Sequence, residues 1–229
     1  DNAFKVAVRC RPLLPREKTT QPDSALTISG TSVAVTTNPD DEAMAGGRTP
    51  RAASPRRPRR GSQEETVKAY SFDRVYDASS TQEGLYSELV GPYAAKMHSG
   101  YNVTVFAYGQ TGTGKTYTIT GDRNDPAHMG IMPRAFTEIF NIAKRDSDKT
   151  ELHVSMYMLE LYCDSLLDLL AERNIDDEAA PPPPKIVIRK NEYGTVMPQG
   201  VVIKKAATAK DLFGVSSAQI LSRRFCCLF

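Results

Sequence analysis

The sequence lacks the features that mark several large classes of protein. It contains no apolar run of membrane-spanning length, so no transmembrane helix is predicted. Its four cysteines, Cys10, Cys163, Cys226 and Cys227, form no CxxC pair, which argues against a disulfide framework and for a reducing compartment. The three histidines have no metal-ligand spacing. The net charge is only +2, so bulk charge implies no polyanionic partner such as a nucleic acid, and we also expect no membrane partner.

The N-terminal part reads as short strands. Phe4–Leu13 alternates apolar and polar residues, which predicts a half-buried strand with Phe4, Val6 and Val8 on one face. Ala25–Thr37 predicts a hairpin that turns at its single glycine. A single domain, or a large part of a bigger one, fits in 229 residues.

The segment Asn38–Lys68 differs in composition from the rest of the chain. It is rich in Pro, Gly, Ser and Arg and almost free of large apolar residues, so we predict a disordered insertion. Within it, Arg48–Gly61 holds six arginines and no acidic residue. The insertion is either a solvated loop or a basic arm for an acidic polymer surface.

Two helices are predicted around the centre of the chain. Ser80 and Glu83 fit a capping box that opens the first helix, and Gly100 is its expected end. Pro92 lies inside this helix and should kink it. The second helix, Met132–Asp146, is amphipathic.

The C-terminal third alternates strand and helix signals. His153–Tyr162 predicts a strand, and Asp164–Leu170 a short helix. Lys185–Lys205 predicts strands joined by a turn at Gly194. Thr208–Arg224 predicts a helix capped by its first residue.

The sequence YGQTGTGKTYT contains the pattern GxxxxGK[ST] directly after a short apolar run, Val103–Tyr108. Such a run predicts a strand buried on both faces of a parallel sheet. Gly109 and Gly114 would let backbone N–H groups turn inward around anionic oxygens. Lys115 would reach the β- and γ-phosphates, and the Thr116 hydroxyl would bind Mg²⁺. The pattern therefore predicts a nucleotide-binding loop.

Four blocks of sequence together resemble the kinesin motor domain: VAVRCRP, YNVTVFAYGQTGTGKTYTITG, GIMPRAFTEIF and MYMLELYCDSLLDLL. The resemblance covers most of Phe4–Arg224 apart from the insertion, and the last block is similar to the C-terminal-motor, minus-end-directed group. It implies an α/β P-loop NTPase fold, with three layers around a central mixed sheet. It also implies ATP and Mg²⁺ as ligands, microtubules (tubulin) as partner and a cytoplasmic, cytoskeletal location.

The resemblance also implies roles for individual residues. Arg9, Arg11 and Pro12 would line the adenine pocket, and the ring of Tyr117 would stack on the base. By sequence pattern alone, Arg9 and Arg11 read as an exposed strand face. Lys115 and Thr116 would be the catalytic residues. The expected phosphate-loop contacts are Gly109, Gln110, Thr111, Gly112, Thr113, Gly114, Lys115, Thr116 and Tyr117.

Two basic pairs are candidate microtubule contacts, because the resemblance places their region against tubulin. They are Arg189 with Lys190 and Lys204 with Lys205. The alternative is a solvated hairpin edge, where lysines deter edge-to-edge pairing. The Arg48–Arg60 cluster could also contact acidic tubulin tails in a salt-sensitive way.

The resemblance stops near Arg224, and neither the NxxSSRSH nor the DxxGxE switch motif of kinesins occurs in these residues. We therefore expect residues 1–229 to be the N-terminal part of a motor domain, incomplete on its C-terminal side. Such a chain would hold ATP without readily aligning the attacking water. It would also be poorly stable alone, because the strand at Val103–Tyr108 would lack both neighbours.

Three hypotheses follow. The first is a microtubule motor that couples ATP hydrolysis to movement. The second is a truncated, non-hydrolysing module that binds nucleotide or tubulin. The third is an unrelated P-loop enzyme such as a small kinase. A homodimer would form through regions outside these residues.

Overall fold

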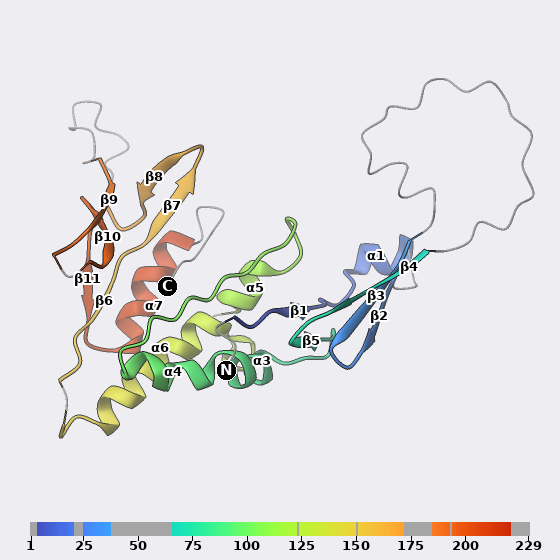
Figure 1. Cartoon of the computed structure of the whole chain (residues 1–229), viewed down its shortest axis with the longest axis horizontal. Coiled ribbons are helices and arrows are strands. Elements are labelled where there is room, and N and C mark those ends of the chain that lie inside the picture. The colour runs from blue at the N-terminus through green and yellow to red at the C-terminus, as the bar shows by residue number, and fades with distance from the viewer. Residues whose placement is uncertain are drawn as a thin grey trace, which may run out of the picture. The chain divides into compact units, whose positions relative to one another are not determined.

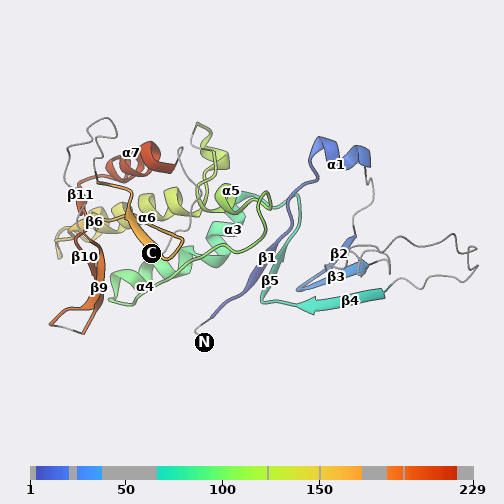
Figure 2. The same ribbon diagram turned by 90° about the horizontal axis from the view of Figure 1, so that it is seen from above.

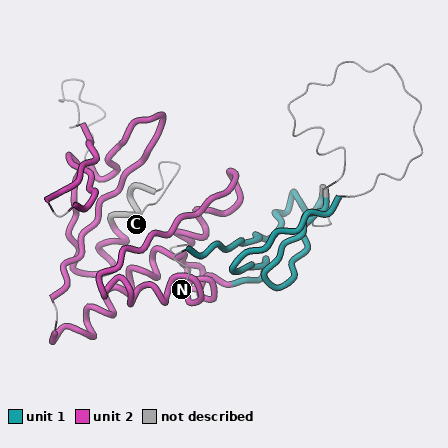
Figure 3. Tube along the Cα trace, viewed as in Figure 1, with its two compact units in different colours: residues 1–80 teal, residues 81–229 magenta. Residues whose placement is uncertain are grey.

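A computed structural model of the protein describes residues 4–20, 25–37, 66–122, 124–149, 151–171, 185–192 and 194–220. The chain divides into two compact units, residues 1–80 and residues 81–229 (Figure 3). In the part of the chain described, no helix is long and apolar enough to cross a membrane.

The described residues of the first unit form two small sheets (Figure 1). One pairs β1 with β5 in parallel, with Ala7 opposite Arg74. The other is antiparallel, in the order β2-β3-β4. Gly30 has φ +58° between β2 and β3, so the predicted hairpin is confirmed. The strands are β1 (Ala7–Arg9), β2 (Leu26–Ser29), β3 (Ser32–Thr37), β4 (Thr66–Ser71) and β5 (Arg74–Tyr76).

The first strand is shorter and more exposed than predicted. Only Ala7–Arg9 pairs as a strand, while Phe4 and Val6 are 83% and 55% exposed, so the prediction of a buried face that includes them was wrong. A helix missed by the sequence analysis follows, α1 (Pro15–Thr20). Proline at its first position suits a helix start, because that N–H would have no partner within the helix.

The predicted insertion Asn38–Lys68 extends three residues too far at its C-terminal end. Its last three residues, 66–68, belong to β4 and pair with β3. Their alternation of Thr, Val and Lys suits a strand, and the Arg-rich composition before them concealed it. The rest of the predicted insertion lies outside the described residues.

The second unit contains four α-helices of eight residues or more within its described part. They are α3 (Gln82–Leu89), α4 (Gly91–His98), α6 (Ile131–Arg145) and α7 (Ala209–Ile220). Thr81, not Ser80, caps α3, because its Oγ1 accepts from Gly84 N at 3.0 Å. The predicted kink at Pro92 is a full break at Val90, after which Pro92 stands in the first turn of α4.

The end of α4 and the start of α7 agree more closely with the predictions from the sequence. The chain leaves α4 through Gly100, with φ +90°, as expected for a helix end. The last helix has the predicted capping arrangement, in which the carboxylate of Asp211 accepts from Thr208 N at 2.8 Å. The Arg224 end of that predicted helix lies outside the described residues.

The strands of the second unit form three two-stranded antiparallel sheets: β6 with β11, β7 with β8, and β9 with β10. Their bounds are β6 (Val154–Met156), β7 (Leu159–Tyr162), β8 (Ser165–Asp168), β9 (Val187–Lys190), β10 (Val196–Gln199) and β11 (Lys204–Ala206). The turn at Gly194, with φ +77°, is as predicted.

The predicted helix at Asp164–Leu170 was wrong. Cys163 and Asp164 both have positive φ, +48° and +59°, and form a two-residue turn that returns the chain as β8. Two consecutive positive φ values match the right-handed twist of a hairpin. The run of leucines in β8 therefore pairs across a hairpin, and Leu169 and Leu170 beyond it pack with Met158.

The core of the second unit lies among its helices. Leu85, Met132 and Leu212 are each 2% exposed. Phe136 on α6 meets Phe213 on α7 edge to face, with ring centroids 5.8 Å apart. Figure 2 shows α6 and α7 side by side. Removing surface of this kind from water is the main term that favours folding.

The apolar run Val103–Tyr108 is extended but belongs to no sheet in the part of the chain described. Val103 and Val105 lie against the apolar faces of α4 and α6, whereas Phe106 and Tyr108 are 73% and 97% exposed. The prediction of a strand buried on both faces is therefore wrong for this structure.

The architecture is mixed α/β, as expected. Within the described residues its strands form five small sheets, and the predicted three layers around one central mixed sheet are not formed by these strands.

Candidate nucleotide-binding site

The loop Gly109–Gly114 joins the extended segment to a short helix, α5 (Lys115–Ile119). Gly109 and Gly114 have φ of +155° and +98°. A Cβ on Gly109 would lie 2.6 Å from Thr113 Oγ1, closer than such atoms approach. Gly114 is the left-handed N-cap of α5, where only glycine is free of strain. The loop shape therefore depends on these glycines.

Lys115 folds back over this loop. Its Nζ donates to Gly109 O at 2.8 Å and to Gln110 O at 3.0 Å. Thr113 Oγ1 donates to the same Gln110 carbonyl at 2.8 Å. The ammonium is thus held at the mouth of the loop, next to the start of α5.

The chemistry of these residues fits a Mg²⁺-bound nucleotide triphosphate. An ammonium, a hydroxyl and glycine-rich backbone amides lie together, and this is the donor set that phosphates use. Thr116 is in the first turn of α5 and is exposed. Its hydroxyl is therefore accessible to a cation bound to the phosphates. Among the described residues no His, Cys, Asp and Glu cluster could hold a metal ion by itself.

A buried glutamine braces the helix that follows the loop. Gln82 is only 3% exposed. Its side-chain Nε2 donates to Tyr117 O at 2.7 Å and to His128 O at 3.2 Å. One amide group therefore ties the start of α3 both to α5 and to the short helix η1 (Pro126–His128).

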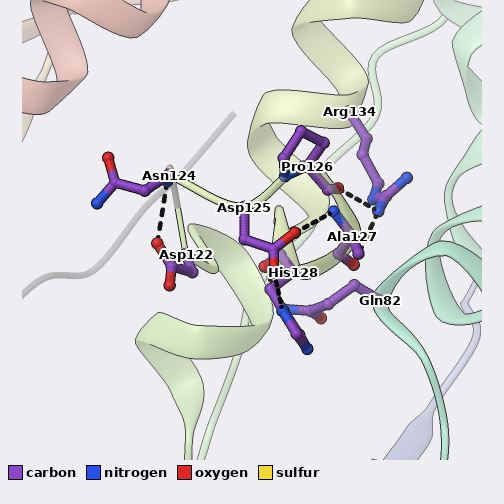
Figure 4. Close-up of polar contacts among 8 residues, drawn as sticks. All are labelled: Gln82, Asp122, Asn124, Asp125, Pro126, Ala127, His128 and Arg134. Atoms are coloured by element: carbon purple, nitrogen blue, oxygen red, sulfur yellow. Dashed lines mark hydrogen bonds and ion pairs between the residues drawn. The ribbon is translucent and has the colours of Figure 1, made fainter.

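The segment after α5 is fastened by further polar contacts (Figure 4). Asp125 caps η1 by accepting from Ala127 N at 2.9 Å, and it also accepts from His128 Nδ1 at 2.7 Å. The hydrogen bond with His128 is the main reason that the pKa of Asp125 is lowered. Arg134 on α6 donates through Nε to Met129 O at 3.0 Å.

Gly121 allows the chain after α5 to pack closely against η1. It has φ +71°, and a Cβ there would collide with the backbone of His128 and Gly130. Asp122 N donates to His128 O at 2.9 Å, and Gly130 N donates to Thr120 O at 3.0 Å. The chain that leaves α5 therefore passes directly against η1.

Tyr117, the predicted base platform, lies beside His128. Their ring centroids are 6.5 Å apart and the ring planes are inclined by 44°. Tyr117 is 43% exposed, so the ring is accessible to a ligand.

The other predicted base contacts, Arg9, Arg11 and Pro12, belong to the first unit. Arg11 donates to both carboxylate oxygens of Glu17, at 2.6 and 2.7 Å. This fork-like pair is the largest cause that lowers the pKa of Glu17 from 4.5 to about 2. Arg9 donates to Ser80 O at 3.4 Å. That these residues meet the nucleotide stays a prediction.

The two basic pairs predicted to bind microtubules are exposed. Arg189 and Lys190 lie on β9, and Lys204 and Lys205 lie on β11, in two separate sheets. Both views place β9 and β11 at the same end of the second unit (Figures 1 and 2). Because successive strand residues point to opposite faces, one member of each pair points away from any one flat surface.

Sequence reasoning missed three residues that shape these sites: Gln82, Arg134 and Glu17. Gln82 and Arg134 act on backbone carbonyls far away in the sequence, which no local pattern reveals. Glu17 stands six residues after Arg11, and an acid in the first turn of a helix opened by proline was the available signal.

Comparison with known proteins identifies the family. A model of the kinesin motor domain matches residues 9–219. The kinesin-like protein KIF3C of Bos taurus is 39% identical over 170 residues, 74% of this chain and 19% of its own length. The kinesin-like protein KIN-5A of Arabidopsis thaliana is 32% identical over 228 residues, 96% of this chain and 20% of its own length. The kinesin-like protein KIN-14I of Oryza sativa subsp. japonica is 38% identical over 149 residues, 65% of this chain and 11% of its own length.

The chain therefore belongs to the kinesin motor-domain family, and its fold class is that of the P-loop NTPases. It spans a fifth or less of the length of these three relatives. The resemblance read from the four sequence blocks is confirmed.

Proposed function

We propose that this chain is the ATP-binding part of a microtubule motor that couples ATP hydrolysis to movement along microtubules. The observation that carries the proposal is the phosphate loop, in which Lys115 is held over the carbonyls of Gly109 and Gln110 at the start of α5. Membership of the kinesin motor-domain family supports it.

In this proposal the loop residues have separate tasks. The N–H groups of the glycine-rich loop bind the phosphates, and Lys115 moves from its loop carbonyls to the β- and γ-phosphate oxygens. The Thr116 hydroxyl would hold Mg²⁺, and the ion would supply positive charge next to the phosphates. Gln82 and Gly121 keep α5 in place beneath the loop. Arg9, Arg11, Pro12 and Tyr117 are each assigned to the base, as the resemblance to kinesins implies.

Microtubule binding is assigned to the exposed basic pairs Arg189–Lys190 and Lys204–Lys205. Their charge suits the acidic surface of tubulin, and such contacts weaken as salt is added. Since neighbouring strand residues face opposite ways, one residue of each pair should carry most of the effect. This proposal places the protein in the cytoplasm, on the cytoskeleton.

The rival hypothesis is a module that binds nucleotide or tubulin without hydrolysis. The family match favours the motor over this alternative and over an unrelated kinase.

The experiment measures nucleotide binding with a ribose-labelled fluorescent ATP and Mg²⁺. Lys115→Ala should weaken binding at least ten-fold, because it removes the ammonium held at the loop mouth. Lys144→Ala, which removes an exposed lysine in the last turn of α6, is the matched control and should leave binding unchanged. Equal loss in both variants, or in neither, would contradict the proposal.

A further inference from the structure

Two aromatic rings next to the phosphate loop are held as one structural pair. Tyr117 and His128 have ring centroids 6.5 Å apart. Their backbone carbonyls both accept from the side-chain amide of Gln82, which is 3% exposed. The two residues are eleven positions apart in the sequence, and a single buried group ties the backbone of one to the backbone of the other.

The imidazole of His128 is also fixed in orientation (Figure 4). Asp125 accepts from its Nδ1 at 2.7 Å, while Asp125 is itself oriented by Ala127 N at 2.9 Å. A carboxylate can only accept, so Nδ1 carries the hydrogen. In the neutral ring Nε2 is then a hydrogen-bond acceptor. In the part of the chain that the structure describes, Nε2 forms no hydrogen bond.

The inclination of the two rings keeps a base from lying flat on both at once. A base stacked on Tyr117 is parallel to that ring and therefore inclined by 44° to the imidazole. Because Asp125 accepts from Nδ1, Nε2 is the ring nitrogen that a polar group of such a base can use. The side chain of His128 is 55% exposed, so the ring is open to a ligand.

We propose that His128 is a specificity-determining residue of the nucleotide site. Its Nε2 accepts a hydrogen bond from the exocyclic amino group of adenine and thereby favours ATP over purine triphosphates that carry an oxygen at position 6. This inference rests on the proposed function, because it requires a nucleotide base on Tyr117. An acceptor facing a carbonyl oxygen loses the hydrogen bond and leaves two acceptors in opposition, which disfavours the purine with an oxygen at position 6.

The test compares the Kd values of ribose-labelled ATP and ITP, which differ at position 6 of the purine. His128→Phe keeps a ring beside Tyr117 and removes the acceptor. We expect the ratio of the ITP Kd to the ATP Kd to fall by about five-fold, the effect of one hydrogen bond. His128→Gln restores an acceptor and should keep at least half of the discrimination. The matched control is His153→Phe, at an 85% exposed histidine elsewhere in the unit.

The outcomes separate the two claims. A ratio in His128→Phe equal to that of the unchanged protein, with ATP still bound, overturns the role of His128 and leaves the proposed function intact. An equal fall in His128→Gln and His128→Phe also overturns it, because shape and not the acceptor would then decide. If the unchanged protein binds neither nucleotide, the proposed function fails and this inference fails with it.

Discussion

The buried amide of Gln82 gives the sharpest prediction about stability. Gln82→Met keeps the length and volume of the side chain and removes both hydrogen bonds, those to Tyr117 O at 2.7 Å and to His128 O at 3.2 Å. Each buried bond contributes about 1 kcal/mol net. His128 O keeps its second donor, Asp122 N at 2.9 Å, so it is not left unpaired. We therefore expect a loss of about 2 kcal/mol in the free energy of unfolding.

The assay is urea unfolding followed by circular dichroism, on the purified protein that contains these residues. Gln199→Met is the matched control, because Gln199 is exposed on β10 and the same change there should alter stability by less than about 0.5 kcal/mol. Since Gln82 anchors α5, Gln82→Met should also weaken ATP binding. Equal stability in Gln82→Met, Gln199→Met and the unchanged protein would refute the bracing role.

Three further predictions concern backbone strain, charge and an unpaired hydroxyl. Gly121→Ala should destabilise the protein by about 2 kcal/mol or more in urea unfolding. Gly121 has a positive φ, and the new Cβ would collide with the backbone of His128. A smaller loss would show that the segment can shift. The pKa of Glu17 is lowered from 4.5 to about 2 beside Arg11, so the pair stabilises the fold fully above about pH 4.5 and loses that effect as the pH falls through 2; a carboxyl NMR titration with a midpoint near 4.5 would contradict this. Tyr86 has a buried hydroxyl with no partner among the described residues, and burial raises its pKa to about 12. Tyr86→Phe should therefore be neutral or stabilising by up to about 1 kcal/mol in the same unfolding assay. A clear loss of stability would reveal a partner for that hydroxyl.

Local chemistry made the phosphate loop predictable from the sequence. Its glycines, lysine and threonine act through positions fixed within eight residues, so the pattern alone implies their arrangement. The turns at Gly30 and Gly194 were predictable for the same reason, since glycine at a positive φ suits a hairpin turn.

The failures have a different physical origin. The leucines of Asp164–Leu170 suit a helix by intrinsic propensity, but the left-handed turn at Cys163 commits them to pairing with β7. Tertiary context overrides such propensities, and a two-residue turn without glycine gives little warning. Similarly, the apolar run Val103–Tyr108 reads as a strand, yet pairing depends on a neighbour that the run itself does not specify.

The polar braces of the site were also beyond sequence reasoning. Gln82 contacts residues 35 and 46 positions away, and both contacts are to backbone carbonyls, which every residue possesses. A buried polar side chain near a helix start leaves no pattern in the sequence. Its role is visible only once α3, α5 and η1 are placed together.

The most direct test of the central claim is the steady-state rate of ATP hydrolysis, with and without microtubules, by the purified motor protein that contains these residues. The account predicts that microtubules raise the rate at least ten-fold and that Lys115→Ala abolishes the rise, while Lys144→Ala does not. A rate that is the same with and without microtubules, or one that survives Lys115→Ala, would contradict it.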